Sequence, residues 1–221
     1  MPATGARRIQ PRHFTSADKR QVRKRSRFKM RITGGKYGGL KLLGPTHEGL
    51  RPTTDMLREA LFNILGATFL NGRVLDLFAG AGTLGIEALS RGARAVTFVE
   101  KDPKGLRLLK QNLRRLPDTN NTEVRVYPVD VLRILPKISR DEAPYDLIFI
   151  DPPFHADLWF RVLELISRLS VLATTGQIVV EIPRRSLLPE RIGCLQRVDK
   201  RVYGEVSLEF WEYIDDGADG E

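Results

Sequence analysis

From Arg73 onward, short apolar segments alternate with amphipathic ones along the chain. The apolar segments are rich in β-branched and aromatic residues and are bounded by glycine, proline or polar clusters, as buried strands are. They cover residues 74–78, 95–100, 124–127, 145–150 and 177–182. Helices are expected between them: one ends near residue 91, one begins at 102, a short one covers 131–135, and one begins near 157. This alternation predicts an α/β fold in which helices cover both faces of a mostly parallel sheet.

The segment before this core has a different pattern. Residues 30–43 combine two apolar stretches with a central run of glycines, which predicts a β-hairpin. Thr54 is a candidate cap for a helix that follows, with Leu57 and Leu61 on its apolar face. We therefore expect a hairpin and a helix in front of the alternating core.

The C-terminal segment also departs from the alternation. Residues 194–202 and 205–213 read as two strands joined by a tight turn, so they add an antiparallel edge to the sheet. We expect one domain over residues 30–221, with the hairpin and helix in 30–70 and the alternating core in 71–214.

Positive charge is concentrated at the N-terminus. Residues 1–31 hold eleven Lys and Arg and one acid, Asp18, whereas the rest of the chain is close to neutral and the whole chain carries +9. Such a segment buries too little apolar surface to fold alone, so we expect a disordered arm over residues 1–29. Its charge suits salt-dependent binding to nucleic acid phosphates, although a solubilising tail and an organelle transit peptide remain alternatives. The candidate RNA contacts from this charged region are Lys24, Arg25, Arg27 and Arg31.

Composition excludes several other classes of protein. No apolar run approaches the length of about 20 residues that spans a bilayer, and the first 30 residues lack the apolar segment of a secretory signal. Cys194 is the only cysteine, and the three histidines are scattered, so neither an intramolecular disulfide nor a metal site is expected. A cytoplasmic protein is the simplest interpretation.

A glycine loop follows the first strand of the core. Phe78-Ala79-Gly80-Ala81-Gly82-Thr83-Leu84-Gly85 matches the spacing G-x-G-x-x-G between a strand and a helix. Glycines at these positions allow tight turns and close approach to a ligand. Glu100 follows Gly80 by 20 residues, at the end of the second strand, where a carboxylate can accept both ribose hydroxyl hydrogens. The combination predicts a cofactor that contains a nucleoside, and it fits a nicotinamide dinucleotide as well as other cofactors.

Two further acids favour a different cofactor from a dinucleotide. Asp76 lies inside the first strand, where a carboxylate can hold the ammonium group of an amino-acid cofactor, although it could also brace a loop. Asp130-Val131 follows the third strand and is placed to meet an adenine amino group and its ring. This second pair could equally form a helix cap.

Asp151-Pro152-Pro153-Phe154 directly follows the strand over residues 145–150. The prolines fix the backbone, so the Pro152 carbonyl and the Asp151 carboxylate can each accept a hydrogen from an exocyclic base amine. Those hydrogen bonds favour a pyramidal nitrogen whose lone pair can attack a methyl group. Phe154 offers a face on which an extruded base can stack, and Asp151 is the candidate proton acceptor. Alternatively, the segment could simply end the strand, with an acid and an aromatic residue there by chance. That interpretation would explain only the two prolines.

Several segments taken together resemble one known family. They are Gly34-Gly35, Leu50–Asp55, Arg58-Glu59, Leu61–Asn63, Asp76–Gly80, Leu84–Arg91 and Asp151–Phe154. From about Arg31 to Tyr213, the chain is similar to the bacterial small-subunit ribosomal RNA guanine-N2 methyltransferases, the RsmD family. The Asp-Pro-Pro-Phe motif is shared with adenine-N6 enzymes, whereas the Arg51-Pro52-Thr53-Thr54-Asp55 segment with the hairpin narrows the resemblance to this family.

The resemblance implies a Rossmann-like class I methyltransferase sheet of seven strands and S-adenosylmethionine as the methyl donor. It places the cofactor on residues 76–82, including Asp76, Phe78, Ala79, Gly80 and Gly82, together with Glu100 and Asp130-Val131. It places the target guanine on Asp151–Phe154, with Asp151 also next to the cofactor. The segment Arg51–Asp55, with Arg51 and Thr53, would border both the cofactor and the RNA. The implied partner is small-subunit ribosomal RNA or the assembled small subunit, and nothing in the sequence requires more than a monomer.

Three other functions remain open at this point. An adenine-N6 methyltransferase acting on RNA or DNA would use the same Asp-Pro-Pro-Phe motif. A dinucleotide-dependent oxidoreductase would use the glycine loop but leaves that motif without a role. A non-catalytic RNA-binding module would explain the basic arm but neither the loop nor the motif.

Overall fold

The structure is a computed structural model that describes residues 7–8, 29–44, 55–66, 69–118, 122–153 and 158–214. Within these residues the main sheet has nine strands in the order β1-β6-β5-β4-β7-β8-β11-β10-β9. The strands are β1 (Arg7–Arg8), β4 (Arg73–Leu77), β5 (Ala95–Val99), β6 (Glu123–Tyr127), β7 (Tyr145–Ile150), β8 (Leu172–Pro183), β9 (Arg191–Ile192), β10 (Leu195–Tyr203) and β11 (Val206–Tyr213). A separate antiparallel pair consists of β2 (Lys29–Arg31) and β3 (Lys41–Leu43).

The order of the strands confirms the predicted fold. Strands β6, β5, β4, β7 and β8 are parallel, and β11 and β10 continue the sheet as an antiparallel hairpin. These seven longer strands are the ones expected for a class I methyltransferase, and the two-residue strands β1 and β9 extend the edges. The chain moves outward from β4 through β5 to β6 and then returns to the other side of β4 with β7. The switch point therefore lies between β4 and β7, where an open α/β sheet binds its ligand.

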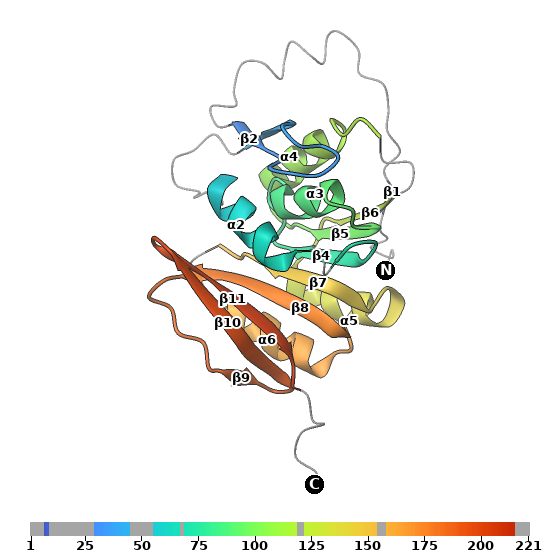
Figure 1. Ribbon diagram of the computed structural model, residues 1–221. Helices are drawn as coiled ribbons and strands as arrows, with labels where there is room; N and C mark the ends of the chain where they lie inside the picture. The colour runs from blue at the N-terminus through green and yellow to red at the C-terminus, as the bar shows by residue number, and fades with distance from the viewer. Residues whose placement is uncertain are drawn as a thin grey trace.

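Helices cover both faces of the sheet. They are α2 (Asp55–Leu65), α3 (Thr83–Ser90), α4 (Pro103–Leu113), α5 (Val131–Asp141) and α6 (Leu158–Arg168). The apolar sides of α2, α3 and α4 belong to one core cluster, and those of α5 and α6 belong to the other (Figure 1). None of the helices in the described part of the chain is long and apolar enough to cross a bilayer.

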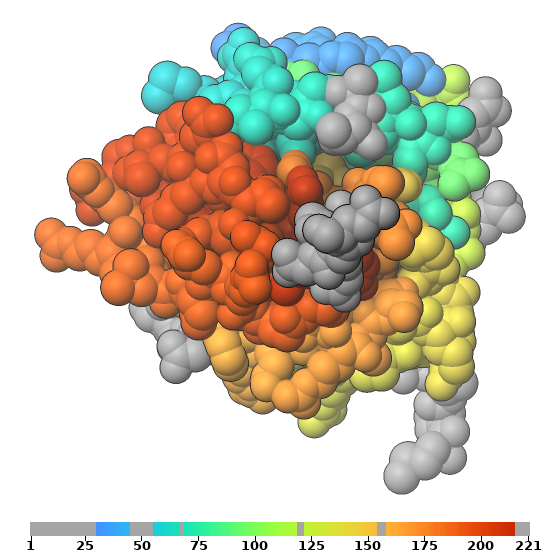
Figure 2. All heavy atoms as spheres, turned by 60° about the horizontal axis from the view of Figure 1, so that its bottom comes forward, coloured from blue at the N-terminus to red at the C-terminus, as the bar shows by residue number. Residues whose placement is uncertain are grey.

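Helix α2 packs against the half of the sheet that contains β7 and β11. Phe62 on α2 packs against Phe149 on β7, with ring centroids 5.8 Å apart. Leu208 and Phe210 on β11 belong to the same apolar cluster. Accordingly, the cyan atoms of α2 and the red atoms of the C-terminal strands lie next to each other on the face in Figure 2. Apolar side chains of the hairpin, α2 and the core thus share one buried cluster.

A single buried carboxylate holds the N-terminal hairpin on α3. Glu87 is fully buried and accepts hydrogen bonds from the Thr33 N–H (2.8 Å), the Thr33 hydroxyl (2.7 Å) and the Gly34 N–H (2.9 Å). It also accepts one from Arg91 Nε at 2.8 Å, and Arg58 Nε lies 3.9 Å away. These contacts give a physical role to Gly34, Arg58, Glu87 and Arg91 of the segments that carry the family resemblance.

Replacing Glu87 with alanine should destabilise the protein by about 3–5 kcal/mol. The substitution leaves the Arg58 and Arg91 charges without their buried carboxylate, and breaking a buried ion pair costs that much. Chemical denaturation monitored by circular dichroism measures the loss. Glu164→Ala is the matched control, because Glu164 forms an exposed pair with Arg168 that contributes less than about 1 kcal/mol. Equal losses in the two variants would contradict a central role for Glu87.

Helix α5 is longer than the sequence predicts. The sequence predicts a short helix over residues 131–135, but the helix continues through Pro136 to Asp141. A proline inside a helix lacks an N–H and clashes with the preceding turn, which destabilises the helix. Ile134, Leu135 and Ile138 on this helix are all buried against the sheet. Burial of this apolar side offsets the cost of the proline.

Two strand boundaries also differ from the prediction. Phe78 lies outside β4, in a left-handed conformation with φ of 63°, so the strand ends one residue earlier than the predicted end at residue 78. Strand β8 begins at Leu172 and includes the segment before Gln177, where polar residues hide the strand pattern. Pairing within the sheet, rather than local composition, therefore decides where β4 ends and where β8 begins.

Candidate active site

The carboxyl ends of β4 and β7 carry the predicted cofactor loop and the Asp-Pro-Pro segment. The two strands pair in parallel with Leu77 opposite Ile150, so Phe78 and Asp151 are the first residues beyond that pair. Gly80 and Gly82 have φ values of 54° and 80°, which only glycine adopts at little cost. The switch point therefore joins the two motifs that the sequence places more than 60 residues apart.

The third glycine of the loop has a different role. A Cβ atom at Gly85 would lie 2.7 Å from Cζ of Phe98 and 3.0 Å from Oδ2 of Asp76. Both separations are too short for a side chain in a packed core. Gly85 therefore lets the start of α3 approach the sheet and bring its N–H to Asp76.

Asp76 is a buried carboxylate inside β4. Only 2% of its surface is exposed, and its Oδ2 accepts the Gly85 N–H at 2.9 Å. Burial raises the pKa of Asp76 to about 7; the Gly85 hydrogen bond opposes the shift and the charge of Glu100 adds to it. A carboxylate in this position gains most from a cationic ligand, as the sequence analysis expects for the ammonium group of an amino-acid cofactor.

Glu100 braces the glycine loop. Its Oε2 accepts the Gly80 N–H and its Oε1 accepts the Asp102 N–H, each at 2.6 Å. Burial raises the pKa of Glu100, and these backbone hydrogen bonds counteract part of that rise. A carboxylate oxygen has more than one lone pair, so Glu100 can hold the loop and still accept the hydroxyl hydrogens of a ribose.

Asp130 caps helix α5. Its carboxylate accepts the Leu132 N–H at 3.0 Å and the Lys101 ammonium group at 2.9 Å. Burial by itself would raise the pKa of Asp130, but the hydrogen bond and charge of Lys101 lower it. Val131 is buried in the core under α5 and α6. The helix-cap alternative is thus observed, while a contact of this pair with an adenine remains a prediction.

The Asp-Pro-Pro segment leaves β7 at the switch point. Pro152 is buried, Pro153 is exposed, and Asp151 is partly covered. Burial raises the pKa of Asp151 well above its usual range, and the charges of Glu181 and Asp76 raise it further. Asp76 and Asp151 lie on paired strands, β4 and β7, close enough for their charges to interact.

Glu181 was missed in the sequence analysis. It lies on β8 and is only 6% exposed, within a segment that the sequence predicts simply as an apolar strand. The sequence could have indicated a functional role for Glu181, because it is a single acid among Ile178, Val179, Val180 and Ile182. A strand that is buried on both faces seldom contains a charged residue that has no structural or functional role. With Asp76, Glu100 and Asp151, it forms a group of carboxylates at the carboxyl edge of the sheet.

Arg31 is the described member of the predicted RNA contacts. Its side chain is 65% exposed, and its Nε lies 3.2 Å from the Asp55 carboxylate at the start of α2. The other predicted contacts lie outside the described residues: Lys24, Arg25, Arg27, Arg51 and Thr53. Phe154, the predicted stacking residue, and Thr54, the predicted helix cap, lie outside them as well.

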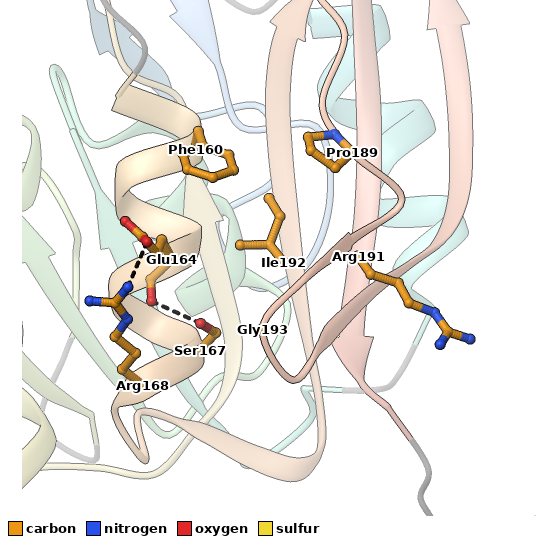
Figure 3. Close-up of a pocket in the computed structure, with 8 residues that line it drawn as sticks. All are labelled: Phe160, Glu164, Ser167, Arg168, Pro189, Arg191, Ile192 and Gly193. Carbon is orange, nitrogen blue, oxygen red and sulfur yellow. Dashed lines mark hydrogen bonds and ion pairs between the residues drawn. The ribbon is translucent and has the colours of Figure 1, made fainter.

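A cavity of about 430 Å³ lies between α6 and β9, away from these motifs (Figure 3). Phe160 and Glu164 line it from α6, and Pro189 and Ile192 line it from the segment around β9. Strand β9 is the last strand of the sheet, four positions from β7. The residues that line this cavity include none of the predicted site residues.

Comparison with known proteins identifies the family to which this chain is similar. Residues 30–212 match the family model described as Conserved hypothetical protein 95. The chain is 35% identical over 183 residues to the ribosomal RNA small subunit methyltransferase D of Escherichia coli, covering 83% of this chain and 89% of that protein. It is 39% identical over 152 residues to the Haemophilus influenzae protein of the same name, covering 69% and 78% of the two chains.

Solved structures show the same fold. A Thermus thermophilus protein superposes with a TM-score of 0.69 at 36% identity, covering 83% of this chain and 99% of that chain. An Escherichia coli protein described as a candidate methyltransferase, yhhF, superposes with a TM-score of 0.71 at 33% identity, covering 84% and 98% of the two chains. With a family match over nearly the whole described core and relatives of this similarity, the chain belongs to the RsmD family of ribosomal RNA methyltransferases.

Proposed function

We propose that this protein transfers a methyl group from S-adenosylmethionine to the exocyclic N2 amine of a guanine in small-subunit ribosomal RNA. The observation that carries the proposal is the position of Asp151-Pro152-Pro153 beside Asp76 at the switch point, in a chain of this family. The substrate is ribosomal RNA, either free or in the assembled small subunit. The enzyme acts in the cytoplasm as a monomer.

The residues at the carboxyl edge fit the proposed cofactor. Asp76 suits the ammonium group because it is a buried carboxylate whose pKa of about 7 falls when a cation is beside it. Glu100 suits the ribose hydroxyls, and the left-handed backbone at Gly80 and Gly82 suits close approach of a ligand. When bound, S-adenosylmethionine supplies a methyl group that its positively charged sulfur activates, so the reaction needs no metal or covalent enzyme intermediate.

The Asp-Pro-Pro segment prepares the amine. The guanine N2 lone pair is delocalised into the ring, which makes the amine a poor nucleophile. Hydrogen bonds from the amine to the Asp151 carboxylate and to the Pro152 carbonyl favour a pyramidal nitrogen, and the prolines hold that carbonyl in place. The nitrogen must lose a proton after it gains the methyl group. Asp151 accepts this proton, because burial and the neighbouring charges raise its pKa above the usual range and so make it a stronger base.

Nucleoside analysis tests the proposal. Small-subunit RNA and small subunits that lack the modification are incubated with isotopically labelled S-adenosylmethionine, digested and analysed by mass spectrometry. Label in N2-methylguanosine supports the proposal. Label in N6-methyladenosine would favour the adenine-N6 alternative, which shares the Asp-Pro-Pro-Phe motif. Absence of label together with tight binding of a nicotinamide dinucleotide would favour the oxidoreductase alternative.

Deleting residues 1–28 should weaken binding to RNA and reduce its salt dependence, with little effect on folding. Nine of the chain's Lys and Arg are in this segment, and each lost phosphate contact lowers the slope of log K against log salt by roughly 0.7–0.9. Fluorescence anisotropy with labelled RNA at several salt concentrations measures the slope. An unchanged slope would mean that the arm acts only as a solubilising tail.

A further inference from the structure

The pairing of β7 with β8 places a second carboxylate beside Asp151. Ile150 is opposite Val180 in this parallel pair, so Asp151 and Glu181 follow at the next position of the two strands. Side chains alternate along a strand, and Phe149 and Val179 both belong to the core under α2 and α3. Asp151 and Glu181 therefore project from the sheet on that same side.

Two carboxylates on neighbouring strands at the same edge repel each other when both are ionised. Glu181 is 6% exposed, and its charge raises the pKa of Asp151. On the other side of Glu181, the residue opposite on β11 is the apolar Leu208. Burial of like charges costs free energy unless hydrogen-bond donors or cations compensate it. A ligand that presents several N–H groups to both carboxylates would offset their mutual repulsion.

The Watson–Crick edge of guanine presents such a set of donors. Guanine carries an N1–H next to the two hydrogens of its N2 amine, whereas adenine carries an amine next to N1, which is an acceptor. A carboxylate that faces N1 therefore attracts guanine and repels adenine. The Asp-Pro-Pro segment alone does not make this distinction, because it contacts only an amine.

We propose that Glu181 is a specificity-determining residue whose carboxylate accepts the N1–H of the target guanine while Asp151 and Pro152 hold the N2 amine. This assignment rests on the proposed function. It gives the site a means of selecting guanine over adenine that lies outside the Asp-Pro-Pro-Phe motif. It also explains why a charged residue occupies an otherwise apolar strand at this edge of the sheet.

The experiment compares guanosine with 2-aminopurine riboside at the methylated position. 2-Aminopurine keeps the N2 amine but has no hydrogen on N1. After the target nucleotide is mapped, small-subunit RNA is ligated with either base at that position, assembled into subunits, and methylated by the full-length wild-type and Glu181→Gln enzymes. The ratio of kcat/KM for the two substrates does not depend on the fraction of enzyme that is folded.

The wild-type enzyme should prefer guanosine by about 100-fold, as expected from a hydrogen bond to a charged group. For Glu181→Gln the preference should fall to about tenfold or less, because a carboxamide can also donate a hydrogen bond to the unprotonated N1 of 2-aminopurine. Glu212→Gln is the matched control. Glu212 lies on β11 and accepts a hydrogen bond from Gln177 Nε2 at 2.7 Å, so its replacement should leave the wild-type preference unchanged.

Two outcomes would overturn the assignment. One is an identical preference in the wild-type and Glu181→Gln enzymes. The other is a loss of more than tenfold in affinity for S-adenosylhomocysteine in Glu181→Gln, measured by calorimetry, since it would place Glu181 against the cofactor. Failure of the proposed function is a separate result, because the wild-type enzyme itself would then form no N2-methylguanosine.

Discussion

Replacing Asp151 with asparagine should lower kcat by about 1000-fold and leave the affinity for S-adenosylhomocysteine within a few-fold of the wild-type value. The asparagine keeps the size of the side chain and one hydrogen-bond acceptor, but it cannot take a proton from the methylated nitrogen. Loss of a general base combined with loss of a charge aimed at the reacting amine accounts for an effect of this size. Single-turnover methyl transfer to small subunits measures the rate.

Asp199→Asn is the matched control for this prediction. Asp199 is an acid on β10 whose carboxylate pairs with the Arg201 guanidinium group at 2.7 Å, on a strand far from the switch point. Its replacement should leave kcat unchanged. A variant of Asp151 that transfers methyl groups at the normal rate but no longer binds S-adenosylhomocysteine would show that Asp151 serves the cofactor instead of the amine.

Replacing Asp76 with asparagine should weaken cofactor binding by about 100-fold and at the same time stabilise the free protein above pH 7. The weaker binding follows from the loss of a buried charge that faces a cation, which is worth about 3 kcal/mol. Asparagine can still accept the Gly85 N–H, so the local structure should be retained. Calorimetric titration with S-adenosylmethionine measures the affinity.

The effect on stability follows from the raised pKa of Asp76. In the folded protein this carboxyl has a pKa of about 7, above its value in the unfolded chain, so between about pH 4 and pH 7 the folded state binds more protons. The stability of the wild-type protein therefore falls as pH rises through this window. Asparagine does not ionise, so Asp76→Asn should be more stable than the wild type by about 2 kcal/mol at pH 8 and equally stable at pH 4.

Denaturant titrations of both proteins at pH 4, 6 and 8 check this prediction. The same linkage makes binding of the cationic cofactor stronger as pH rises through 7 in the wild type, because Asp76 must be ionised to pair with a cation. The affinity of Asp76→Asn should depend less on pH over this range. A difference in stability that is the same at all three pH values would contradict the role assigned to ionisation of Asp76.

Local sequence patterns were sufficient to predict most of the fold. The glycine loop, the Asp102-Pro103 helix start and the tight turn before β11 each depend on a few adjacent residues, and each is found where it was predicted. Prediction was wrong where the sheet overrides a local preference. Helix α5 passes through Pro136 because its apolar side remains buried, and Phe78 leaves β4 because the loop needs a left-handed turn there.

The sequence by itself determined the class of fold, because the alternation of strands and helices follows from a regular pattern of apolar residues. It also determined the glycine loop and the Asp-Pro-Pro segment, because each is a motif of adjacent residues. The tertiary structure decided how the acids of the site act on one another. It placed Glu181 beside Asp151, gave Glu100 the task of bracing the loop, and buried Asp76 deeply enough to raise its pKa. These effects depend on strand register and on the exclusion of water, and both arise only when segments distant in sequence pack together.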